Sequence, residues 1–307
     1  MDKERLKRII GYLFSKKFWA SQLISRRKIS RLLPDKTYLK MQTYVLRGEK
    51  LDLKNPKRLN HKLQWLKLYD RKPIYTQLVD KYLAKEYIAK RFGEEYVVPT
   101  YGVWKTPEEI DFDSLPNQFV LKCNHNCAEG ICICKDKSTL NKEEAKAKLG
   151  RALKKNFYWQ CREWPYKNVP PLILAEKYLE TKEGKIPNDY KLHYINGELQ
   201  FVYVSYDRQG VNDRCVYDSN WNRLPFVWVP ALKPDMNTAD VPCPQTFEQM
   251  KDFGAQIAKD FKYVRVDYYD IDGKLYFGEI TLFHGAGYDY FFPDEYDFIF
   301  GEKLKLK

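Results

Sequence analysis

The residues best suited to chemistry lie in one stretch near the C-terminal end, YVRVDYYDIDGKLYFGEITLFHGAG at positions 263–287. Two alternating, aromatic-rich segments flank an Asp-Gly pair, which is a strong signal for a β-hairpin. Because side chains alternate along a strand, Arg265 and Asp267 share one face of the first strand, and Glu279 and Thr281 share one face of the second. Two carboxylates beside an arginine suit Mg²⁺ and a polyphosphate. The alternative is a salt bridge on a solvated hairpin face.

The length of the hairpin turn decides whether these two faces are the same. A two-residue loop, Asp272-Gly273, would place Asp267 and Glu279 on opposite faces of the sheet. A three-residue loop that begins at Ile271 would place both carboxylates on one face, and it favours a left-handed glycine at Gly273. We therefore expect the three-residue loop, with Arg265, both carboxylates and the Thr281 hydroxyl on one patch.

Two earlier segments carry weaker signals for a nucleotide site. Lys122 lies in a predicted strand, 119–125, that runs directly into the small-residue turn 126–130. A lysine and the backbone N–H groups of such a turn can hold phosphate oxygens, although an edge-strand lysine is equally consistent with the pattern. AEKYLE (175–180) ends an apolar strand with charges, either to face an adenosine or as an ordinary strand end. The sequence contains neither GxxxxGK[ST] nor GxGxxG.

Other chemistries have less support. Asp270-Ile271-Asp272 is a D-x-D element, which a glycosyltransferase could use to hold a metal and a nucleotide sugar. It falls at the hairpin tip, however, where Asp-Gly is ordinary turn chemistry. There is no GxSxG, and the four histidines have no triad spacing. His284 follows the carboxylate strand and lies either near the site or in an unrelated loop.

Composition favours a globular protein with an anionic partner. The chain has 307 residues, 44% of them hydrophobic, which suffices for a substantial core. Its formal net charge of +12 fits a nucleotide, an acidic glycan or an anionic lipid. Nucleic acid is not expected, because acidic residues are interspersed with the basic ones and no known binding motif is present.

The cysteines and the hydropathy predict a cytoplasmic location. Seven cysteines form an odd set, which fits a reduced protein better than a disulfide framework. No signal peptide and no apolar run long enough for a spanning helix is visible. Residues 1–34 predict a basic amphipathic helix that either packs on the main body, which we favour, or contacts the inner face of a membrane.

The remaining pattern predicts an α+β fold with a helical N-terminal region. Residues 35–115 read as mainly helical, with 78–95 the clearest helix. The following blocks are 116–180, with strands and a helix at 141–158 capped by Asn141, and 181–307, which is mainly strands. Asn196-Gly197 predicts a second hairpin within 189–208.

The order of these segments resembles the ATP-grasp enzymes, which include D-alanine–D-alanine ligases. The sequence shows DKYLAK, the strand lysine, the small-residue loop, EKYL, and then RVD followed by GEIT. NPKRLNHKLQWLKLYDR and the following segments to FVLKCNH look like the TupA-like ATP-grasp proteins of cell-surface polysaccharide loci. The likeness covers about residues 35–295. It implies that two α+β subdomains, 116–180 as the lid and 181–307 with the metal site, clasp ATP.

The resemblance also implies roles for individual residues. Lys81 or Lys85, with Lys122, would contact the ATP phosphates, and the loop 124–130 would cover them. The residues implied for cofactor binding are Lys81, Lys85, Lys122, Asn124, His125, Gly130, Glu176, Lys177 and Leu179, with Asp189 on the ribose. Asp267 and Glu279 would hold Mg²⁺, with Thr281 standing where the family often has asparagine. Lys191 would lie beside the phosphates, and Arg265 would face the transferred phosphoryl group.

The implied reaction is ligation. ATP-grasp ligases phosphorylate a carboxylate with ATP, and an amine then attacks the acyl phosphate. The resemblance implies an acidic sugar or an amino acid of a surface glycan as substrate. Arg208 and Arg214 are candidate clamps for a substrate carboxylate, because a guanidinium can bind a carboxylate through two parallel hydrogen bonds. A kinase or a glycosyltransferase acting on a polysaccharide precursor is the alternative.

Overall fold

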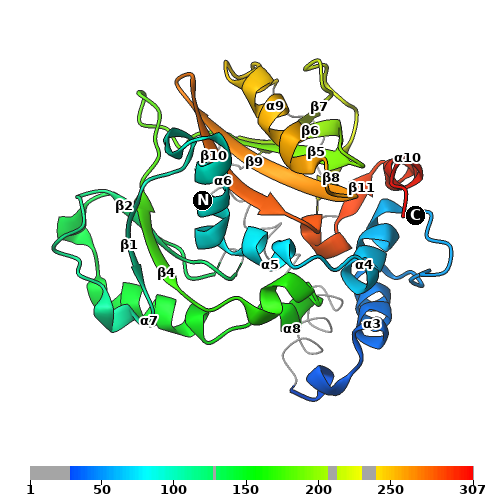
Figure 1. Ribbon diagram of the computed structural model, residues 1–307, viewed down its shortest axis with the longest axis horizontal. Coiled ribbons are helices and arrows are strands. Elements are labelled where there is room, and N and C mark those ends of the chain that lie inside the picture. The colour runs from blue at the N-terminus through cyan, green and yellow to red at the C-terminus, as the bar shows by residue number, and fades with distance from the viewer. Residues whose placement is uncertain (1–27, 127–128, 207–212, 230–239, 307) are drawn as a thin grey trace, which may run out of the picture.

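The computed structural model describes residues 28–126, 129–206, 213–229 and 240–306. The fold is α+β, as predicted, with helices packed around antiparallel sheets (Figure 1). Its α-helices are α3 Asp35–Arg47, α4 Leu59–Tyr69, α5 Ile74–Val79, α6 Lys81–Phe92, α7 Lys142–Leu153, α8 Tyr158–Cys161, α9 Phe247–Ala258 and α10 Glu295–Lys303. Of the predicted helix at 1–34, residues 1–27 lie outside the described residues, and a short 3₁₀ turn spans Lys28–Leu32.

The small sheet contains four strands in the order β1-β4-β2-β3. These strands are β1 Thr100–Trp104, β2 Phe119–Cys123, β3 Cys132–Cys134 and β4 Ile173–Lys177. Helix α7 covers one face, where Leu149 packs with Phe119 and Leu121 in a separate apolar cluster. Residue 116, the expected boundary of the lid, falls between β1 and β2, which belong to the same sheet.

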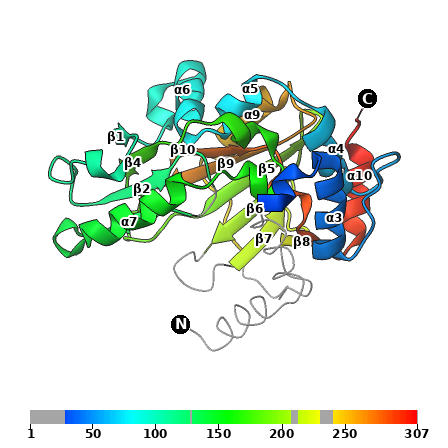
Figure 2. The ribbon, with the colours of Figure 1, turned by 90° about the horizontal axis from the view of Figure 1, so that it is seen from below.

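The large sheet contains five strands in the order β10-β9-β5-β6-β7. Its strands are β5 Asp189–Ile195, β6 Glu198–Tyr206, β7 Asp213–Tyr217, β9 Tyr263–Ile271 and β10 Lys274–Thr281. A separate pair joins β8 Val227–Val229 to β11 Tyr290–Phe292. Helices α5, α6 and α9 lie on one side of the five-stranded sheet (Figure 2). The predicted Asn196-Gly197 hairpin is present, with both turn residues at positive φ.

The turn of the β9–β10 hairpin differs from the expected one. It is a two-residue loop, because Ile271 pairs with Lys274, and Asp272 and Gly273 both have positive φ, at 52° and 84°. This turn matches the twist of the strands without an extra residue. The prediction of a three-residue loop was therefore wrong.

The two carboxylates nevertheless share a face, because the extra residue lies inside strand β10. The pairing shifts between Phe277 and Glu279, so Gly278 is bulged and Glu279 lies directly opposite Asp267. A bulge adds one residue to one strand and so reverses the alternation of every side chain beyond it. Asp267 and Glu279 thus lie on one face, as predicted, but because of the bulge at Gly278 and not because of the turn.

Substituting Gly278 is expected to destabilise this bulge. A Cβ at Gly278 would lie 3.0 Å from the Asp267 carbonyl oxygen, which is part of the paired strand and has little room to shift. We expect Gly278→Ala to lower the free energy of unfolding by about 1–3 kcal/mol, measured by urea denaturation. The matched control is Gly150→Ala in α7, whose Cβ would meet only Pro107 Cγ at 3.6 Å. Gly150→Ala should raise the free energy of unfolding by about 0.5–1 kcal/mol. An equal loss of unfolding free energy in both variants would contradict the role of the bulge.

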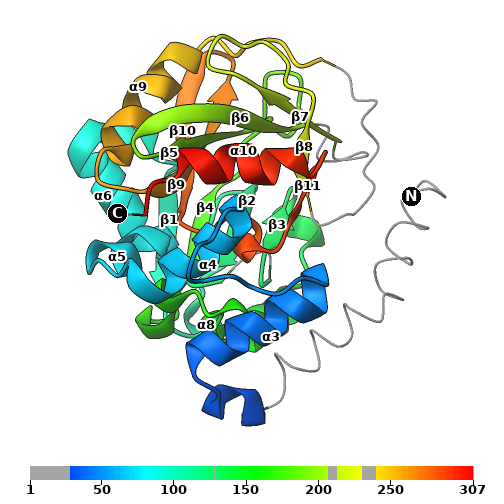
Figure 3. The same cartoon turned by 90° about the vertical axis from the view of Figure 1, so that its right-hand side faces the viewer.

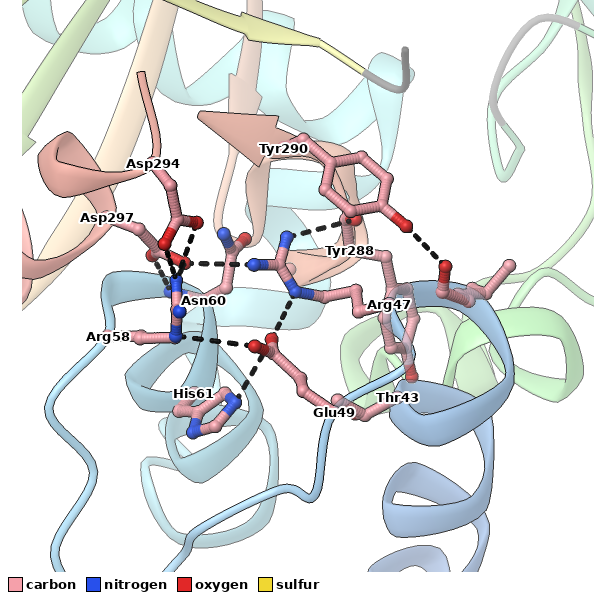
Figure 4. Close-up of polar contacts among 12 residues, drawn as sticks. Thr43, Arg47, Glu49, Arg58, Asn60, His61, Tyr288, Tyr290, Asp294 and Asp297 are labelled. Atoms are coloured by element: carbon pink, nitrogen blue, oxygen red, sulfur yellow. Dashed lines mark hydrogen bonds and ion pairs between the residues drawn. The ribbon is translucent and has the colours of Figure 1, made fainter. Parts of the chain in front are cut away.

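The N-terminal helices are joined to the C-terminal helix by buried ion pairs. Figure 3 shows α4 beside α10, with α3 below α4. Arg47 of α3 donates to Asp297 of α10 at 3.1 Å, and both side chains are almost completely buried. Arg58 contacts Asp294 and Asp297, and Glu49 bridges Arg47 and Arg58 (Figure 4). Removing one partner of a buried pair costs about 3–5 kcal/mol, so residues 35–60 belong to the same folding unit as α10.

Candidate functional site

A buried glutamate on the small sheet joins two lysines. Glu176 of β4 forms ion pairs with Lys85 and with Lys122, whose Nζ lies 2.5 Å from Oε2. Lys85 also donates to the Val98 carbonyl at 2.9 Å and to Thr100 Oγ1 at 2.8 Å. Burial lowers the pKa of Lys85 to about 8 even though Glu176 opposes the shift. The structure therefore brings together three of the residues that the sequence implied for cofactor binding.

Helix α6 adds a third lysine because of its N-terminal cap. Asp80 Oδ1 accepts hydrogen bonds from the backbone N–H groups of Tyr82 and Leu83, which begins the helix at Lys81. Lys85 follows one turn later, so both lysines lie on the same side of the helix. Lys81 Nζ donates to the Asn126 carbonyl at 2.6 Å and so reaches the loop 124–130.

The loop 124–130 is anchored by its first residues. Asn124 is fully buried, donates to the Pro170 carbonyl at 2.9 Å and accepts from the Leu172 N–H. His125 is also buried and contacts the Lys155 carbonyl at 3.0 Å. Both side chains thus have hydrogen-bond partners inside the fold. At the other end of the loop, Gly130 has a left-handed backbone with φ of 71°. Residues 127–128 lie outside the described residues, and cofactor binding by this loop remains a prediction.

The other implied nucleotide residues lie at the end of β4 and the start of β5. Lys177 is exposed, and its backbone N–H donates to the Pro99 carbonyl at 2.9 Å. Leu179 follows the strand and is half-buried. Asp189 is buried beside Lys191, and its Oδ1 has no hydrogen-bond partner within the described residues. Within the part of the chain that the structure describes, no hydrogen bond or ion pair joins these three residues to Glu176, Lys85 or Lys122, and their roles remain predictions.

Arg265 connects the two carboxylates of the hairpin. Its Nε donates to Asp267 Oδ1 at 2.6 Å, and its Nη2 donates to Asp267 Oδ2 at 2.6 Å and to Glu279 Oε1 at 2.6 Å. Lys191 reaches Asp267 Oδ2 at 2.9 Å from the neighbouring strand β5. Thr281 Oγ1 donates to Glu279 Oε1 at 3.3 Å. The predicted patch of one arginine, two carboxylates and one hydroxyl is therefore present.

The Glu279 carboxylate interacts electrostatically with cations of both sheets and of α6. Burial raises the pKa of the Glu279 carboxyl, but nearby cations outweigh it and lower the pKa to about 2. These cations are Arg265, Lys81, Lys191 and Lys122. They come from both sheets and from α6, so one carboxylate faces several positive side chains at once. Such a concentration of positive charge attracts a polyanion such as a triphosphate.

A small pocket lies beside Glu279. Its volume is about 10 Å³, enough for about one water molecule, and its polar lining comes from Lys81, Tyr166 and Glu279. Gly278, the bulged residue, also lines it. The bulge therefore places Glu279 on the side of the strand where Lys81 lines the same pocket.

Asp267 and Glu279 meet the chemical requirements for Mg²⁺. The described residues contain no cluster of three or more His, Cys, Asp or Glu arranged for a metal. Mg²⁺, however, usually takes only one or two carboxylates from a protein and the remaining oxygens from water and substrate phosphates. Asp267 and Glu279 accept hydrogen bonds from the same Arg265 nitrogen, so their carboxylates lie side by side, and the Glu279 side chain is 37% exposed. These residues therefore fit a magnesium ion held together with phosphate.

His284 and Arg214 extend the site away from the carboxylates. His284 is buried, and its Nδ1 lies 2.9 Å from Arg265 Nη1. Its Nε2 lies 3.7 Å from Asp289 Oδ2. Burial raises the pKa of Asp289 to about 6, and Arg214 is the strongest opposing charge. Arg214 thus lies near this end of the site, whereas Arg208 lies outside the described residues.

The D-x-D element has a structural role in the turn. Asp270 accepts from Thr246 at the start of α9 and from the Gly273 N–H at 2.8 Å. Asp272 accepts from the Lys182 N–H at 2.9 Å. Both acids therefore have internal hydrogen-bond partners, which hold the hairpin tip against Thr246 and Lys182.

Sequence reasoning missed Glu163, a buried carboxyl near the site. Burial raises its pKa from the ordinary 4.5 to about 7, with Lys67 and Arg265 opposing and Glu279 adding to the shift. The surrounding sequence, CREWPYK, has no periodicity that would separate this glutamate from a solvated loop residue. A local pattern of that kind cannot show a position that the tertiary fold buries.

Glu163 should make stability depend on pH. A carboxyl whose folded pKa exceeds its unfolded pKa stabilises the fold below pH 4.5, and this contribution is lost as pH rises through 7. The shift corresponds to about 3 kcal/mol. We therefore expect Glu163→Gln to gain up to about 3 kcal/mol relative to the unmodified protein between pH 5 and pH 8 in urea denaturation. The control is Glu108→Gln at an exposed position, and identical pH dependence in both variants would contradict this role.

Comparison with known proteins identifies the family. The family model "TupA-like ATPgrasp" matches residues 61–305, which is most of the chain. The chain therefore belongs to the TupA-like ATP-grasp family, and the predicted fold and family are confirmed. No curated protein compared with the chain matches it.

Solved structures of ATP-grasp ligases are similar over much of the chain. The D-alanine–D-alanine ligase of Helicobacter pylori is 16% identical, with a TM-score of 0.44, over 80% of this chain and 69% of that one. The Bacillus licheniformis L-amino acid ligase is 13% identical, with a TM-score of 0.43, over 89% and 61%. The Bacillus anthracis D-alanine–D-alanine ligase complexed with ATP is 16% identical, with a TM-score of 0.38, over 67% and 53%. The chain thus spans about half to two thirds of their lengths, and these similarities are too distant to transfer the role of any residue.

The helices of the described residues were compared with the requirements for a membrane-spanning helix. None of them combines the length and the apolar character needed to cross a bilayer.

Proposed function

We propose that the protein is a Mg²⁺- and ATP-dependent carboxylate–amine ligase that works through an acyl phosphate. The observation that carries this proposal is the convergence of four cations on Glu279, which Arg265 links to Asp267. Positive charge of this density favours a triphosphate, and one or two carboxylates beside it suit Mg²⁺ bound together with phosphate oxygens. Membership of the ATP-grasp family supports the same chemistry.

Each group of residues has a proposed task. Lys85 and Lys122, held by Glu176, orient the nucleotide and its phosphates, with Lys177, Leu179 and Asp189 nearer the adenosine. Lys81 and Lys191 neutralise the phosphate oxygens. Asp267 and Glu279 hold Mg²⁺, which would polarise the γ-phosphoryl group and neutralise its charge.

Arg265 acts on the transferred group. A carboxylate oxygen of the substrate attacks the γ-phosphorus and ADP leaves, so negative charge on the phosphoryl oxygens must be stabilised in the transition state. The guanidinium, fixed by Asp267 and Glu279, donates toward this charge. The amine nitrogen then attacks the acyl carbon, phosphate leaves, and the nitrogen loses a proton to give an amide.

The proposed substrate is an acidic sugar or an amino acid of a surface polysaccharide. The net charge of +12 and the position of Arg214 near His284 and Asp289 support an acidic substrate. Arg208 is proposed as its partner in clamping a carboxylate. A cytoplasmic location follows from the need for ATP, and membrane contact through residues 1–34 is proposed as a peripheral interaction.

Isotope transfer tests the reaction directly. The protein is incubated with Mg-ATP, amines and a panel of uronic acids and amino acids labelled with ¹⁸O in the carboxylate, and the products are identified by mass spectrometry. Formation of ADP, a condensed product and phosphate that carries one ¹⁸O supports the acyl-phosphate mechanism. ADP with a stable phosphorylated product would indicate a kinase, and UDP released from a nucleotide sugar would indicate a glycosyltransferase.

A further inference from the structure

The loop that follows β10 has an unusual backbone. Gly285, Ala286 and Gly287 are three consecutive residues with left-handed φ, at 53°, 51° and 68°. For alanine this conformation costs about 1–2 kcal/mol. A Cβ at Gly285 would collide with the Asp289 carboxylate, so glycine is required there. Such strain persists only where the surrounding structure fixes it.

Buried polar side chains of the N-terminal helices hold this loop by its backbone. The carbonyls of Ala286 and Gly287 both accept from Gln64 Nε2 at 2.9 Å, and Ala286 also accepts from Lys67 Nζ at 2.7 Å. The Asp289 carbonyl accepts from Arg47 at 2.6 Å and from Asn60 at 3.0 Å. Figure 4 shows Arg47 and Asn60 pointing to the same region from α3 and α4.

On α4, these side chains form a stripe at the spacing of one helix face. Asn60, Gln64 and Lys67 recur at i, i+4 and i+7, and each is at most 1% exposed. Buried polar groups of this kind are costly unless they are hydrogen-bonded. Their common target is the loop 284–289, so α4 fixes the position of that loop.

The fixed loop presents His284 to Arg265. A guanidinium can only donate, so His284 Nδ1 must accept the hydrogen bond from Arg265 Nη1, and the proton of the neutral ring lies on Nε2. Among the contacts within the described residues, four of the five Arg265 N–H groups are occupied by Asp267, Glu279 and His284. His284 is the one neutral acceptor in this set. As a neutral acceptor, it would keep its hydrogen bond with Arg265 if the two carboxylates held a metal ion.

We propose that His284 is a positioning residue that orients the Arg265 guanidinium toward the transferred phosphoryl group, with the α4 stripe holding His284 in place. This inference rests on the proposed ligase function, because it assigns a role within that site. Residues that orient a metal-binding side chain typically contribute about tenfold to a hundredfold to activity, and we expect a similar contribution from a residue that orients Arg265. The effect should fall on kcat, because His284 is proposed to act through Arg265, whose Nη1 it contacts, and not on ATP itself.

Three substitutions separate positioning from structural support. His284→Ala removes the acceptor and should lower kcat about tenfold to a hundredfold, with KM for ATP changed less than about threefold. His284→Asn places Oδ1 where Nδ1 was and should restore kcat to within about threefold. His284→Gln places its oxygen one bond too far and should behave like His284→Ala. Equal losses in all three variants would overturn the proposal.

A measurement without turnover distinguishes failure of this inference from failure of the proposed function. The chain has only four histidines, so ¹⁵N-histidine NMR can assign each ring by substitution. His284 should show the neutral Nε2–H tautomer, and an Nδ1–H tautomer or an imidazolium would overturn the contact with Arg265. If the unmodified protein gives no ligation product with the ¹⁸O panel, the ligase function fails, while the tautomer still decides whether His284 accepts from Arg265.

Discussion

Glu279→Gln and Asp267→Asn are each expected to lower kcat for Mg-ATP-dependent ADP formation by about a thousandfold or more. Each change replaces one anionic oxygen donor for Mg²⁺ with a neutral amide. Glu279 has the larger diagnostic value, because four cations hold its pKa at about 2 and it is therefore ionised at every pH of interest. ADP release is measured by a coupled assay over a series of Mg²⁺ concentrations, and folding by circular dichroism.

The two variants differ in their structural side effects. Asp267 is only 2% exposed and takes both arms of the Arg265 fork, so Asp267→Asn should also destabilise the protein by about 3–5 kcal/mol. The Glu279 side chain is 37% exposed and should cost less stability. Glu198→Gln, at an exposed position at the start of β6, provides the matched control. Full activity in a folded Glu279→Gln variant would refute the proposed metal site.

The hairpin shows how far local sequence signals reach. Asp-Gly correctly marked the turn, and alternation correctly placed Arg265 with Asp267. The shared face was then attributed to the loop, whereas the extra residue is Gly278 in the following strand. An isolated glycine within a strand pattern is a signal for a bulge, so the sequence did contain the information. Choosing between two ways of adding one residue, however, depends on pairing energies along the whole hairpin.

The family resemblance implied that Lys85, Lys122 and Glu176 serve one site, and their places on regular elements explain why they meet. Lys81 and Lys85 are one helical turn apart, and Lys122 and Glu176 lie on neighbouring strands with a shared face. Such residues meet whenever the elements form as predicted. The predicted strand at 119–125 ends at Cys123, and the side chains of Asn124 and His125 bond to distant backbone groups that no local pattern identifies.

The stripe on α4 illustrates the opposite case. Polar residues at helical spacing ordinarily indicate the solvent side of a helix. Asn60, Gln64 and Lys67 instead face the interior, because the backbone of residues 286–289 supplies acceptors there. Those acceptors exist only in the tertiary fold, about 220 residues away along the chain. A sequence pattern cannot distinguish a buried polar face of this kind from an exposed one.

Arg265→Lys is expected to lower kcat about a hundredfold to a thousandfold, with a smaller effect on KM for ATP. Lysine keeps the positive charge but cannot donate two parallel bonds to Asp267 while also reaching Glu279 and His284. The lost donor is therefore missed chiefly in the transition state, where charge develops on the phosphoryl oxygens. Arg91→Lys, at an exposed position near the end of α6, is the matched control and should leave kcat unchanged. An Arg265→Lys variant with the kcat of the unmodified protein would show that the fork is not needed.

The same variant tests whether His284 acts through Arg265. If it does, His284→Ala should lower kcat strongly in the unmodified background and very little in the Arg265→Lys background, because the group it orients is already lost. Residues that act as one unit give such non-additive effects, whereas independent sites give effects that multiply. The measurement is a double-mutant cycle on kcat under saturating Mg-ATP. Multiplicative losses would mean that His284 contributes by a route separate from the guanidinium, and a loss confined to the unmodified background would show that His284 and Arg265 act as one unit.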